Sequence, residues 1–415
     1  MSKRIVVTGM GVVSPIGNNT AEFWSSLRDG KSGIDKISLF DTSGYSSKIA
    51  GEVKNIDFSQ YVDIKEVRRT DRYILLATIA ADEAIKNSGL NLNEIDKDKI
   101  GTIIASGVGG LTTLENETEK LITRGPKRVS PFLTPMMIAD MASGFVSIKY
   151  GFTGPNYAIV SACASAAHAF GDAFVSMKAG MMDVSVVGGA EAAICRVGIS
   201  GFSSMKALST RNDNPQKASC PFDIKRDGFI MGEGAGILVL ETLEHAQARD
   251  AKIYAELVGY GATADAFHIS QPAPNHTGAQ RAMKMALKIA DIHPQRIDYI
   301  NAHGTSTQFN DKNESKAIIE IFGEHAYNVL ISSTKSMTGH LLGASGGIEL
   351  IASILALNNN IVPPTINYED PDPECPLNYT PNESVHKDLL YVMSNSFGFG
   401  GHNASLIIKK YEASE

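Results

Sequence analysis

Residues 156–180, NYAIVSACASAAHAFGDAFVSMKAG, contain the junction that decides how this chain folds. The apolar run at 156–162 predicts a short strand, and the Ala-rich run after Cys163 predicts a helix. A strand that turns abruptly into a helix leaves the turn residue at the helix N-terminus. Unpaired backbone N–H groups and the helix dipole favour a thiolate at such a position, so we expect Cys163 to be a nucleophile.

The same alternation of strand and helix continues along the whole chain. Strand patterns cover residues 4–8, 101–105, 158–161, 184–187, 237–240, 253–260, 299–302, 329–332, 391–394 and 405–409. Helical patterns include residues 71–87, 164–178, 278–290, 311–322 and 347–357. Gly-rich turns separate these elements, which indicates an α/β fold.

Parts of the first half resemble parts of the second. IGTIIASGVGG (100–110) parallels IDYINAHGTST (297–307), because each is an apolar strand followed by a loop of small residues. The junction at Cys163 likewise parallels VLISSTKSMTGHLLGASGGIELIASILAL (329–357). We therefore expect two related halves, residues 1–250 and 251–415, which divide after the charged helix ETLEHAQARD.

Composition excludes several classes of protein. The 415 residues are 43% hydrophobic and 20% charged, as in an ordinary globular protein, and the net charge of −7 argues against general nucleic-acid binding. The four cysteines show no CxxC and no metal-ligand spacing, so we expect no metal site and a reducing, cytoplasmic location. No apolar run approaches membrane-spanning length, and MSKRIVVTGMG predicts a strand rather than a signal peptide.

Two histidines lie in small-residue turns that follow apolar strands, His303 in NAHGTST and His340 in KSMTGHLLGASGG. Glycines beside them permit close approach of a ligand to the backbone. Lys335 is close enough in sequence to supply a fixed positive charge beside His340. One thiol and two such histidines suggest nucleophilic catalysis at a thioester.

Four further segments bear on function. GFGGHN (398–403) is a Gly-rich turn in which Phe399 could act as a movable gate and its N–H could bind an oxyanion. GMGVVSP (9–15) imitates a dinucleotide fingerprint, but Pro15 is unsuited to a helix interior, so no dinucleotide is expected. Two basic runs are the best candidates for docking an acidic carrier on this acidic chain: IKEVRRTDR, with Lys65, Arg68 and Arg69, and RGPKR, with Arg124 and Lys127.

Together these segments closely resemble the β-ketoacyl-acyl-carrier-protein synthases, especially type II. The resemblance covers nearly the whole chain and includes SACASAAH, VVGGAEAA, PFDIKRDGFIMGEGAG, NAHGTSTQFNDKNE, SSTKSMTGHLLGASGG and NSFGFGGHN. It implies the thiolase-type fold, two related halves in five αβαβα layers, and a homodimer. It also implies decarboxylative condensation of a malonyl carrier with a Cys-bound acyl chain, without a cofactor beyond the carrier's phosphopantetheine.

The resemblance gives roles to individual residues. Cys163 is implied as the acylated nucleophile, His303 and His340 as the decarboxylation pair, and Lys335 as their supporting lysine. Phe399 resembles the gate, and its N–H and that of Cys163 resemble the oxyanion hole. Four further positions are implied as substrate contacts: Thr305 and Thr307 beside the phosphopantetheine arm, Ser270 where Thr is common, and Val108 in the acyl pocket.

Several alternatives stay open at this point. A type I ketoacyl synthase or a polyketide-type ketosynthase would carry the same motifs. A thiolase would want a second Cys in the C-terminal Gly-rich loop, where this chain has His402 in place of the family's common Thr. A chain-length-factor-like subunit would lack Cys163. The sequence does not decide whether a monovalent cation lies near Asn301, Glu349 and Asn395.

Overall fold

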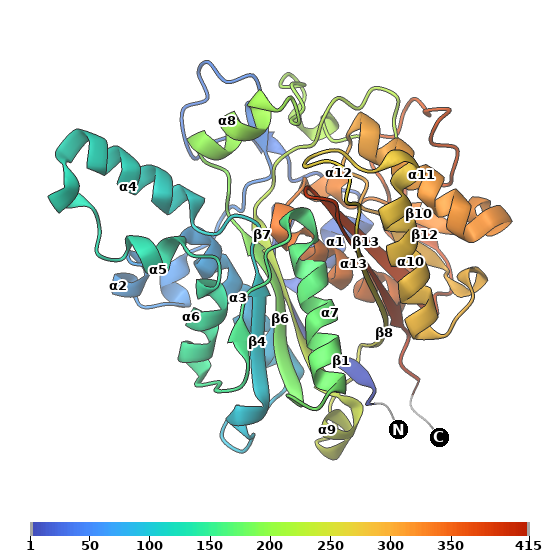
Figure 1. Cartoon of the computed structure of the whole chain (residues 1–415), viewed down its shortest axis with the longest axis horizontal. Helices are drawn as coiled ribbons and strands as arrows, with labels where there is room; N and C mark the ends of the chain where they lie inside the picture. The colour runs from blue at the N-terminus through green and yellow to red at the C-terminus, as the bar shows by residue number, and fades with distance from the viewer. Residues whose placement is uncertain (1–2, 413–415) are drawn as a thin grey trace.

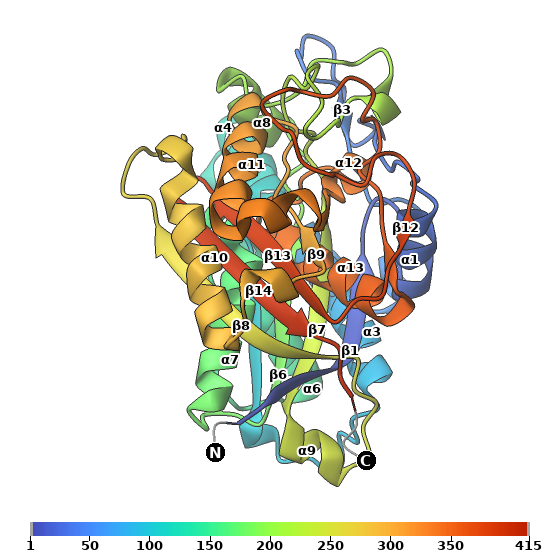
Figure 2. The same cartoon turned by 90° about the vertical axis from the view of Figure 1, so that its right-hand side faces the viewer.

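The computed structural model describes residues 3–412 and is centred on a ten-stranded sheet made of two five-stranded blocks (Figure 1, Figure 2). The first block consists of β1 (Ile5–Val13), β4 (Ile100–Ala105), β5 (Asn156–Tyr157), β6 (Val184–Glu191) and β7 (Gly234–Thr242). The second consists of β8 (Ala255–Ala264), β9 (Tyr299–Asn301), β10 (Leu330–Ser332), β13 (Tyr391–Gly398) and β14 (His402–Lys409).

The two blocks have the same topology. The order across the sheet is β10-β9-β13-β14-β8-β1-β7-β6-β4-β5, so each block, read from its outer edge, places its third strand first, then its second, fourth, fifth and first. Parallel and antiparallel pairings also correspond strand for strand. The blocks join where β1 pairs antiparallel with β8 between Ile5↔Leu257 and Val7↔Ala255.

Helices form three layers around the two blocks. Helices α7 (Ser165–Lys178) and α13 (Ser345–Asn359) lie between the blocks and contact strands of both. Helices α3 (Arg72–Ser88) and α6 (Met141–Tyr150) cover the outer face of the first block, and α10 (Thr277–Ala290) and α11 (Gln308–Phe322) lie outside the second. The remaining helices are α1 (Thr20–Arg28), α2 (Ile64–Val67), α4 (Leu111–Arg124), α5 (Leu133–Met137), α8 (Arg196–Ser204), α9 (Leu243–Ala248) and α12 (Lys335–Thr338). This is the five-layer αβαβα arrangement that the resemblance implies.

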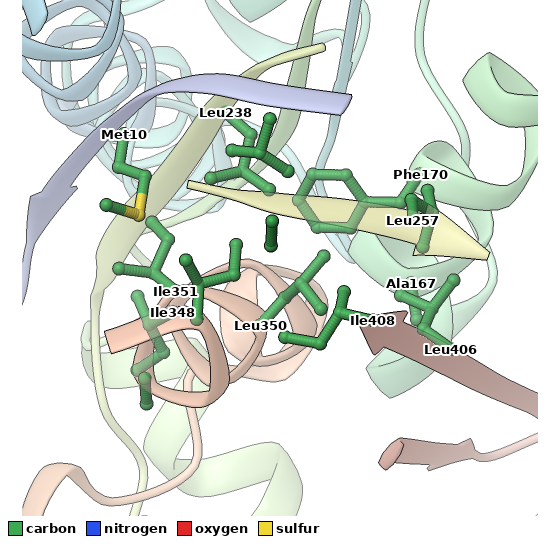
Figure 3. Packing of buried hydrophobic residues seen from close by; sticks show 14 of the residues in the cluster. Met10, Ala167, Phe170, Leu238, Leu257, Ile348, Leu350, Ile351, Leu406 and Ile408 are labelled. Carbon is green, nitrogen blue, oxygen red and sulfur yellow. The ribbon is translucent and has the colours of Figure 1, made fainter. Parts of the chain in front are cut away.

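The middle layer is largely buried because both helices are mostly apolar, and α7 leaves only a narrow edge exposed at Val175 and Lys178. Nearly all of α13 is buried, as expected for a helix that is apolar on every side. Figure 3 shows its side chains meeting those of α7 and of strands from both blocks: Ile348, Leu350 and Ile351 from α13, Ala167 and Phe170 from α7, Leu238 from β7, and Leu257, Leu406 and Ile408 from the second block. The N-terminal ends of both helices are therefore held firmly at the centre of the molecule.

The strand predicted at residues 158–161 is wrong, because β5 ends at Tyr157 and the chain is irregular from there to Ala162. Ala162 adopts a left-handed conformation with φ 51°. A 3-10 turn (Ala162–Ala164) then leads into α7. The left-handed residue is what redirects the chain from the sheet edge into the helix. Within residues 3–412, every helix is too short or too polar to span a bilayer.

Candidate active site

A cavity of about 430 Å³ lies where loops of the two halves meet. Its walls come from the start of α7, the loop after α8, the segment before α10, the loop after β9, the turn before α13 and the hairpin between β13 and β14. Seven of the residues singled out in the sequence border it, namely Cys163, Ser270, His303, Thr305, Thr307, His340 and Phe399. The cavity is therefore where the structure gathers the predicted chemistry.

Three reactive groups converge at the inner end of this cavity. The Sγ of Cys163 and a ring nitrogen of each of His303 and His340 all lie within 4.8 Å of one another. The two imidazole rings are 5.3 Å apart between centroids and nearly perpendicular. A thioester attacked by the sulfur would therefore contact both rings.

The thiolate predicted for Cys163 is not supported by the surroundings of its sulfur. The thiol is buried, and burial raises its pKa to about 12. The positive charge of Lys335 and the Phe399 N–H act in the opposite direction but do not offset the loss of solvation. The resting nucleophile is therefore a thiol, and its proton has to leave as the sulfur attacks.

His340 is held by hydrogen bonds at one ring nitrogen. The Leu342 N–H donates to Nδ1 over 3.3 Å, and the Ser345 Oγ lies 2.8 Å from the same atom. Because Nδ1 accepts a backbone N–H, the proton of the neutral ring is on Nε2. Burial and the charge of Lys335 lower the pKa of His340 well below its usual value, so the ring is neutral at pH 7.

His303 is held in a similar way by a buried lysine. The Nζ of Lys335 lies 3.4 Å from Nδ1 and donates to the His303 carbonyl over 2.7 Å. An ammonium group has no acceptor, so Nδ1 carries the lone pair and Nε2 the proton. Burial, the charge of Lys335 and His340 together lower the pKa of His303 well below its usual value. Both histidines are thus neutral hydrogen-bond donors.

Acidic residues hold these groups in place. From the sequence Glu349 is named only as a possible cation contact, and sequence reasoning missed Glu314 and Asp311. Glu349 on α13 forms a buried ion pair with Lys335. Glu314 on α11 accepts the N–H groups of His303 and Gly304, each over 2.8 Å. Asp311 accepts the next two N–H groups of the same loop. Asp311 lies in the first turn of α11, after a Gly-rich turn, and this position was the available signal, because carboxylates there commonly bind turn N–H groups.

The Gly-rich hairpin lies against the nucleophile turn. A Cβ on Gly398 would be 2.9 Å from the Ser161 carbonyl oxygen and 3.0 Å from the Cys163 nitrogen, so only glycine fits there. Phe399 is half-buried, and its ring faces that of Phe202 on α8 at 6.4 Å. The ring of His402 packs against Gly400, which has φ 84°. Phe202 carries no sequence signal, because its place depends on how α8 packs.

The structure leaves other predicted residues outside the cavity. Val108 is 42% exposed in the loop after β4 and does not border the cavity, so its predicted place in the acyl pocket is not reproduced in this chain alone. The five basic residues of the two docking candidates are all exposed. Lys65 lies on α2, and Arg68 and Arg69 follow that helix directly. Arg124 is the last residue of α4, and Lys127 lies three residues after it. In Figure 1, α2 and α4 lie to the left, on the side of the molecule opposite α11. The body of α4 contacts α8 through ion pairs of Arg196 with Glu115 and Glu119, but none of the five basic residues borders the cavity.

Three side chains at the site have the spacing of metal ligands. Cys163 and the two histidines offer three ligand atoms at suitable spacing. The ammonium of Lys335 lies beside them and opposes a second cation. Asn301 Oδ1 and Glu349 Oε2 are also buried without hydrogen-bond partners among the described residues, and carbonyl and carboxylate oxygens are the ligands of hard cations. The charge of Glu349, however, is already balanced by its ion pair with the same Lys335.

Known proteins match this chain along its length. Residues 2–246 match the beta-ketoacyl synthase N-terminal domain, and residues 254–369 match the C-terminal domain. The chain is 51% identical over 410 residues to 3-oxoacyl-[acyl-carrier-protein] synthase 2 of Synechocystis sp. and 53% identical over 412 residues to that of Staphylococcus aureus strain COL, with 99% of each chain covered. These matches confirm the resemblance recognised in the sequence.

Solved structures agree over the same length. A chain of the ishigamide ketosynthase/chain length factor is 34% identical, with a TM-score of 0.94 over 99% of this chain and 100% of that one. A beta-ketoacyl synthase from Burkholderia phymatum STM815 is also 34% identical, with a TM-score of 0.92 and the same coverage. A chain of a type II polyketide ketosynthase solved with its acyl-carrier protein is 36% identical, with a TM-score of 0.91, again covering 99% and 100%. The predicted thiolase-type fold is confirmed.

Proposed function

The chain belongs to the beta-ketoacyl synthase family, and from this premise we propose that it lengthens acyl chains by two carbons as a 3-oxoacyl-[acyl-carrier-protein] synthase of type II. The observation that carries the proposal is the convergence of one thiol and two neutral histidines within 4.8 Å at the inner end of a cavity. A thiolase would need a second thiol there, and among the described residues Cys163 alone of the four cysteines borders the cavity.

The first half-reaction transfers the acyl group to the enzyme. The Cys163 sulfur attacks the carbonyl carbon of an acyl thioester, a C–S bond forms, and the bond to the carrier sulfur breaks. The proton of the Cys163 thiol ends on the departing carrier thiol, so the step is balanced without an external base. The N–H groups of Cys163 and Phe399 would stabilise the oxyanion, and removing one such donor typically costs about 2.7–4 kcal/mol of transition-state stabilisation.

The second half-reaction uses the two histidines. A malonyl thioester loses CO₂, and the electron pair becomes an enolate whose oxygen accepts hydrogen bonds from the Nε2–H groups of His303 and His340. Two neutral donors suit this task, because the enolate oxygen gains charge as CO₂ departs. The enolate carbon then attacks the acyl group on Cys163. The Cys163 thiolate leaves and takes a proton from solvent.

The proposal is tested by locating the acyl group and separating the half-reactions. After incubation with an acyl carrier protein, mass spectrometry should find the acyl group on Cys163. His303→Ala and His340→Ala should retain this acylation and lose malonyl decarboxylation, so that acyl-enzyme accumulates. Acylation at another residue, or normal decarboxylation by either variant, would overturn the assignment. His293→Ala, an exposed histidine, is the matched control.

We propose an acyl carrier protein as the partner, with Lys65, Arg68, Arg69, Arg124 and Lys127 as one docking face. A second basic group, Lys206, is exposed at the cavity border itself. Separate Glu substitutions decide between the two places. Arg68→Glu with Arg69→Glu should raise KM for carrier-bound substrate and weaken its salt dependence, and an effect confined to Lys206→Glu would place docking at the cavity.

A homodimer and a cytoplasmic location complete the proposal. Support for the dimer comes from the first block's edge strand β5, near which Ile148 is 78% and Val160 59% exposed. Support for the location comes from the four free thiols. Sedimentation equilibrium measures the oligomeric state, and a monomer at micromolar concentration would contradict the homodimer. The substrate roles of Val108, Ser270, Thr305 and Thr307 also stay proposals.

A further inference from the structure

His276 is a buried histidine that the reaction above does not use. It lies directly before α10, has a left-handed backbone with φ 52°, and is only 2% exposed. Its ring nevertheless borders the cavity that holds Cys163 and His303. A histidine so placed is either packing or a contact for the substrate.

The ring is positioned by an aromatic neighbour that it shares with the catalytic centre. Its centroid is 4.7 Å from that of Phe397, and the Phe397 centroid is 5.7 Å from that of His303. Phe397 thus contacts both imidazoles. His276 therefore lies about one aromatic ring away from the place where the thioester reacts.

Neither ring nitrogen of His276 makes a hydrogen bond of good geometry among the described residues, although the Asn310 side chain lies near enough to act on its pKa. Buried polar atoms are almost always hydrogen-bonded, and an exception at a cavity wall points to a partner that arrives with a ligand. Packing against Phe397 alone would be served equally well by an apolar ring. The unused nitrogens are the observation that separates a substrate contact from simple packing.

The chemistry of the missing partner follows from the charge state of the ring. Burial lowers the pKa of His276 to about 4, although Asp265 and Asn310 act against this shift, so the ring is neutral at pH 7. A neutral imidazole offers one N–H donor and one acceptor nitrogen. A secondary amide matches both. A carboxylate matches only the donor, and the negative charge of Asp265 close by disfavours a second anion.

We propose that His276 is a substrate-binding residue that hydrogen-bonds a secondary amide of the pantetheine arm when a carrier-bound thioester enters the cavity. The inference rests on the proposed function, since it takes the arm to occupy this cavity. It adds a contact for the substrate beside Phe397. Phe397 lies at the end of β13, two residues before the gate residue Phe399. His276 would thus recognise the pantetheine arm through its amide groups, whatever acyl chain the arm carries.

The test compares two small hexanoyl thioesters, hexanoyl-pantetheine and the amide-free S-propyl hexanethioate. His276→Phe keeps an aromatic ring against Phe397 and the same backbone demand, but it removes both nitrogens. Acylation of Cys163, followed by mass spectrometry, should slow about tenfold with hexanoyl-pantetheine, the loss expected for one buried hydrogen bond. With the amide-free thioester the rate should stay within about twofold of wild type.

Two further variants serve as controls. His276→Asn should recover part of the rate with hexanoyl-pantetheine, because Asn offers both a donor and an acceptor and tolerates a left-handed backbone. His386→Phe makes the same exchange at an exposed site in β12 (Val385–His386) and should change neither rate.

Three results would overturn the inference. Equal slowing with both thioesters would mean that His276 only supports the fold of the site. Unchanged rates with both would mean that it contacts no part of the arm. Slowed malonyl decarboxylation with normal acylation would assign it to the carboxylate instead. Acylation of Cys163 by the amide-free thioester in every variant would meanwhile leave the proposed nucleophile intact.

Discussion

The turn that opens α7 and the turn that opens α13 have the same backbone shape and face different surroundings. Each begins with a left-handed residue, Ala162 at φ 51° or Leu342 at φ 47°, followed by a 3-10 turn and a helix that starts at a serine. In this correspondence Cys163 of the first turn matches Gly343 of the second. Cys163 borders the cavity, whereas a Cβ on Gly343 would lie 2.2 Å from the Gly107 nitrogen.

The difference shows that the backbone turn does not by itself make a nucleophile site. The second turn is closed by Glu191, whose buried carboxylate accepts the Gly343 N–H over 2.9 Å and the Gly107 N–H over 2.7 Å. No side chain fits at that position. The second half contributes His340 instead, from just before its turn, and His303 from the loop after β9. One half thus supplies the proposed nucleophile and the other the two histidines proposed as hydrogen-bond donors.

The largest expected effect separates the two turns by activity. Cys163→Ala should abolish condensation, at least about a thousandfold, because no other thiol among the described residues borders the cavity. Its cost in stability should be below about 1 kcal/mol, since the lost atom lines an open cavity. Steady-state assays and a melting curve measure both. Residual condensation above a hundredth of wild type would remove Cys163 from the mechanism.

The counterpart change should act on stability. Gly343→Ala places a methyl group against the backbone of Gly107, which has no flexible side chain to move aside. We expect a loss of about 3 kcal/mol in the free energy of unfolding. Urea denaturation measures it, with Gly201→Ala on the surface of α8, where a Cβ meets nothing within 4 Å, as the control. Equal stability of the two variants would show that the second turn is not closed.

The sequence predicted most of this comparison and missed the part that depends on distant segments. Strand and helix positions follow from local periodicity, and the proposed catalytic residues are recognisable because each lies in its own short motif. Glu191 closes the second turn from β6 of the first half, and nothing near Gly343 in sequence indicates it. The family resemblance predicts that Val108 lies in the acyl pocket. In the structure the Val108 N–H donates to Glu191, and the Val108 side chain is exposed.

The titration of Cys163 gives a third test. Burial raises its pKa to about 12, above that of Cys195, Cys220 and Cys375, each at about 11. A raised thiol pKa means less thiolate at neutral pH, so alkylation should rise about tenfold per pH unit between about pH 7 and 9 without levelling. Access still favours Cys163, because among the four it alone borders the cavity.

Iodoacetamide labelling followed by peptide mapping checks both statements. Cys163 should be labelled first at every pH, and its rate should keep rising. A plateau below about pH 8 would mean that the helix N-terminus lowers the pKa of Cys163 more than burial raises it. Faster labelling of Cys195 would mean that thiolate fraction rather than access decides.

The smallest expected effect compares the two serines that begin the helices. The Ser165 hydroxyl donates to the Ala162 carbonyl over 2.6 Å and accepts the Ser161 N–H over 2.8 Å, so it holds only its own turn. The Ser345 hydroxyl instead lies 2.8 Å from Nδ1 of His340. Ser345→Ala should therefore slow malonyl decarboxylation about fivefold, because the Leu342 N–H still fixes the tautomer while the ring loses one of its two anchors. Ser165→Ala should leave the decarboxylation rate nearly unchanged and cost about 1 kcal/mol of stability.

The two serine variants are measured side by side, with acylation of Cys163 as a common reference. The pair shows whether one turn geometry serves structure in the first half and orients a catalytic ring in the second. A decarboxylation loss in Ser165→Ala as large as in Ser345→Ala would contradict that division.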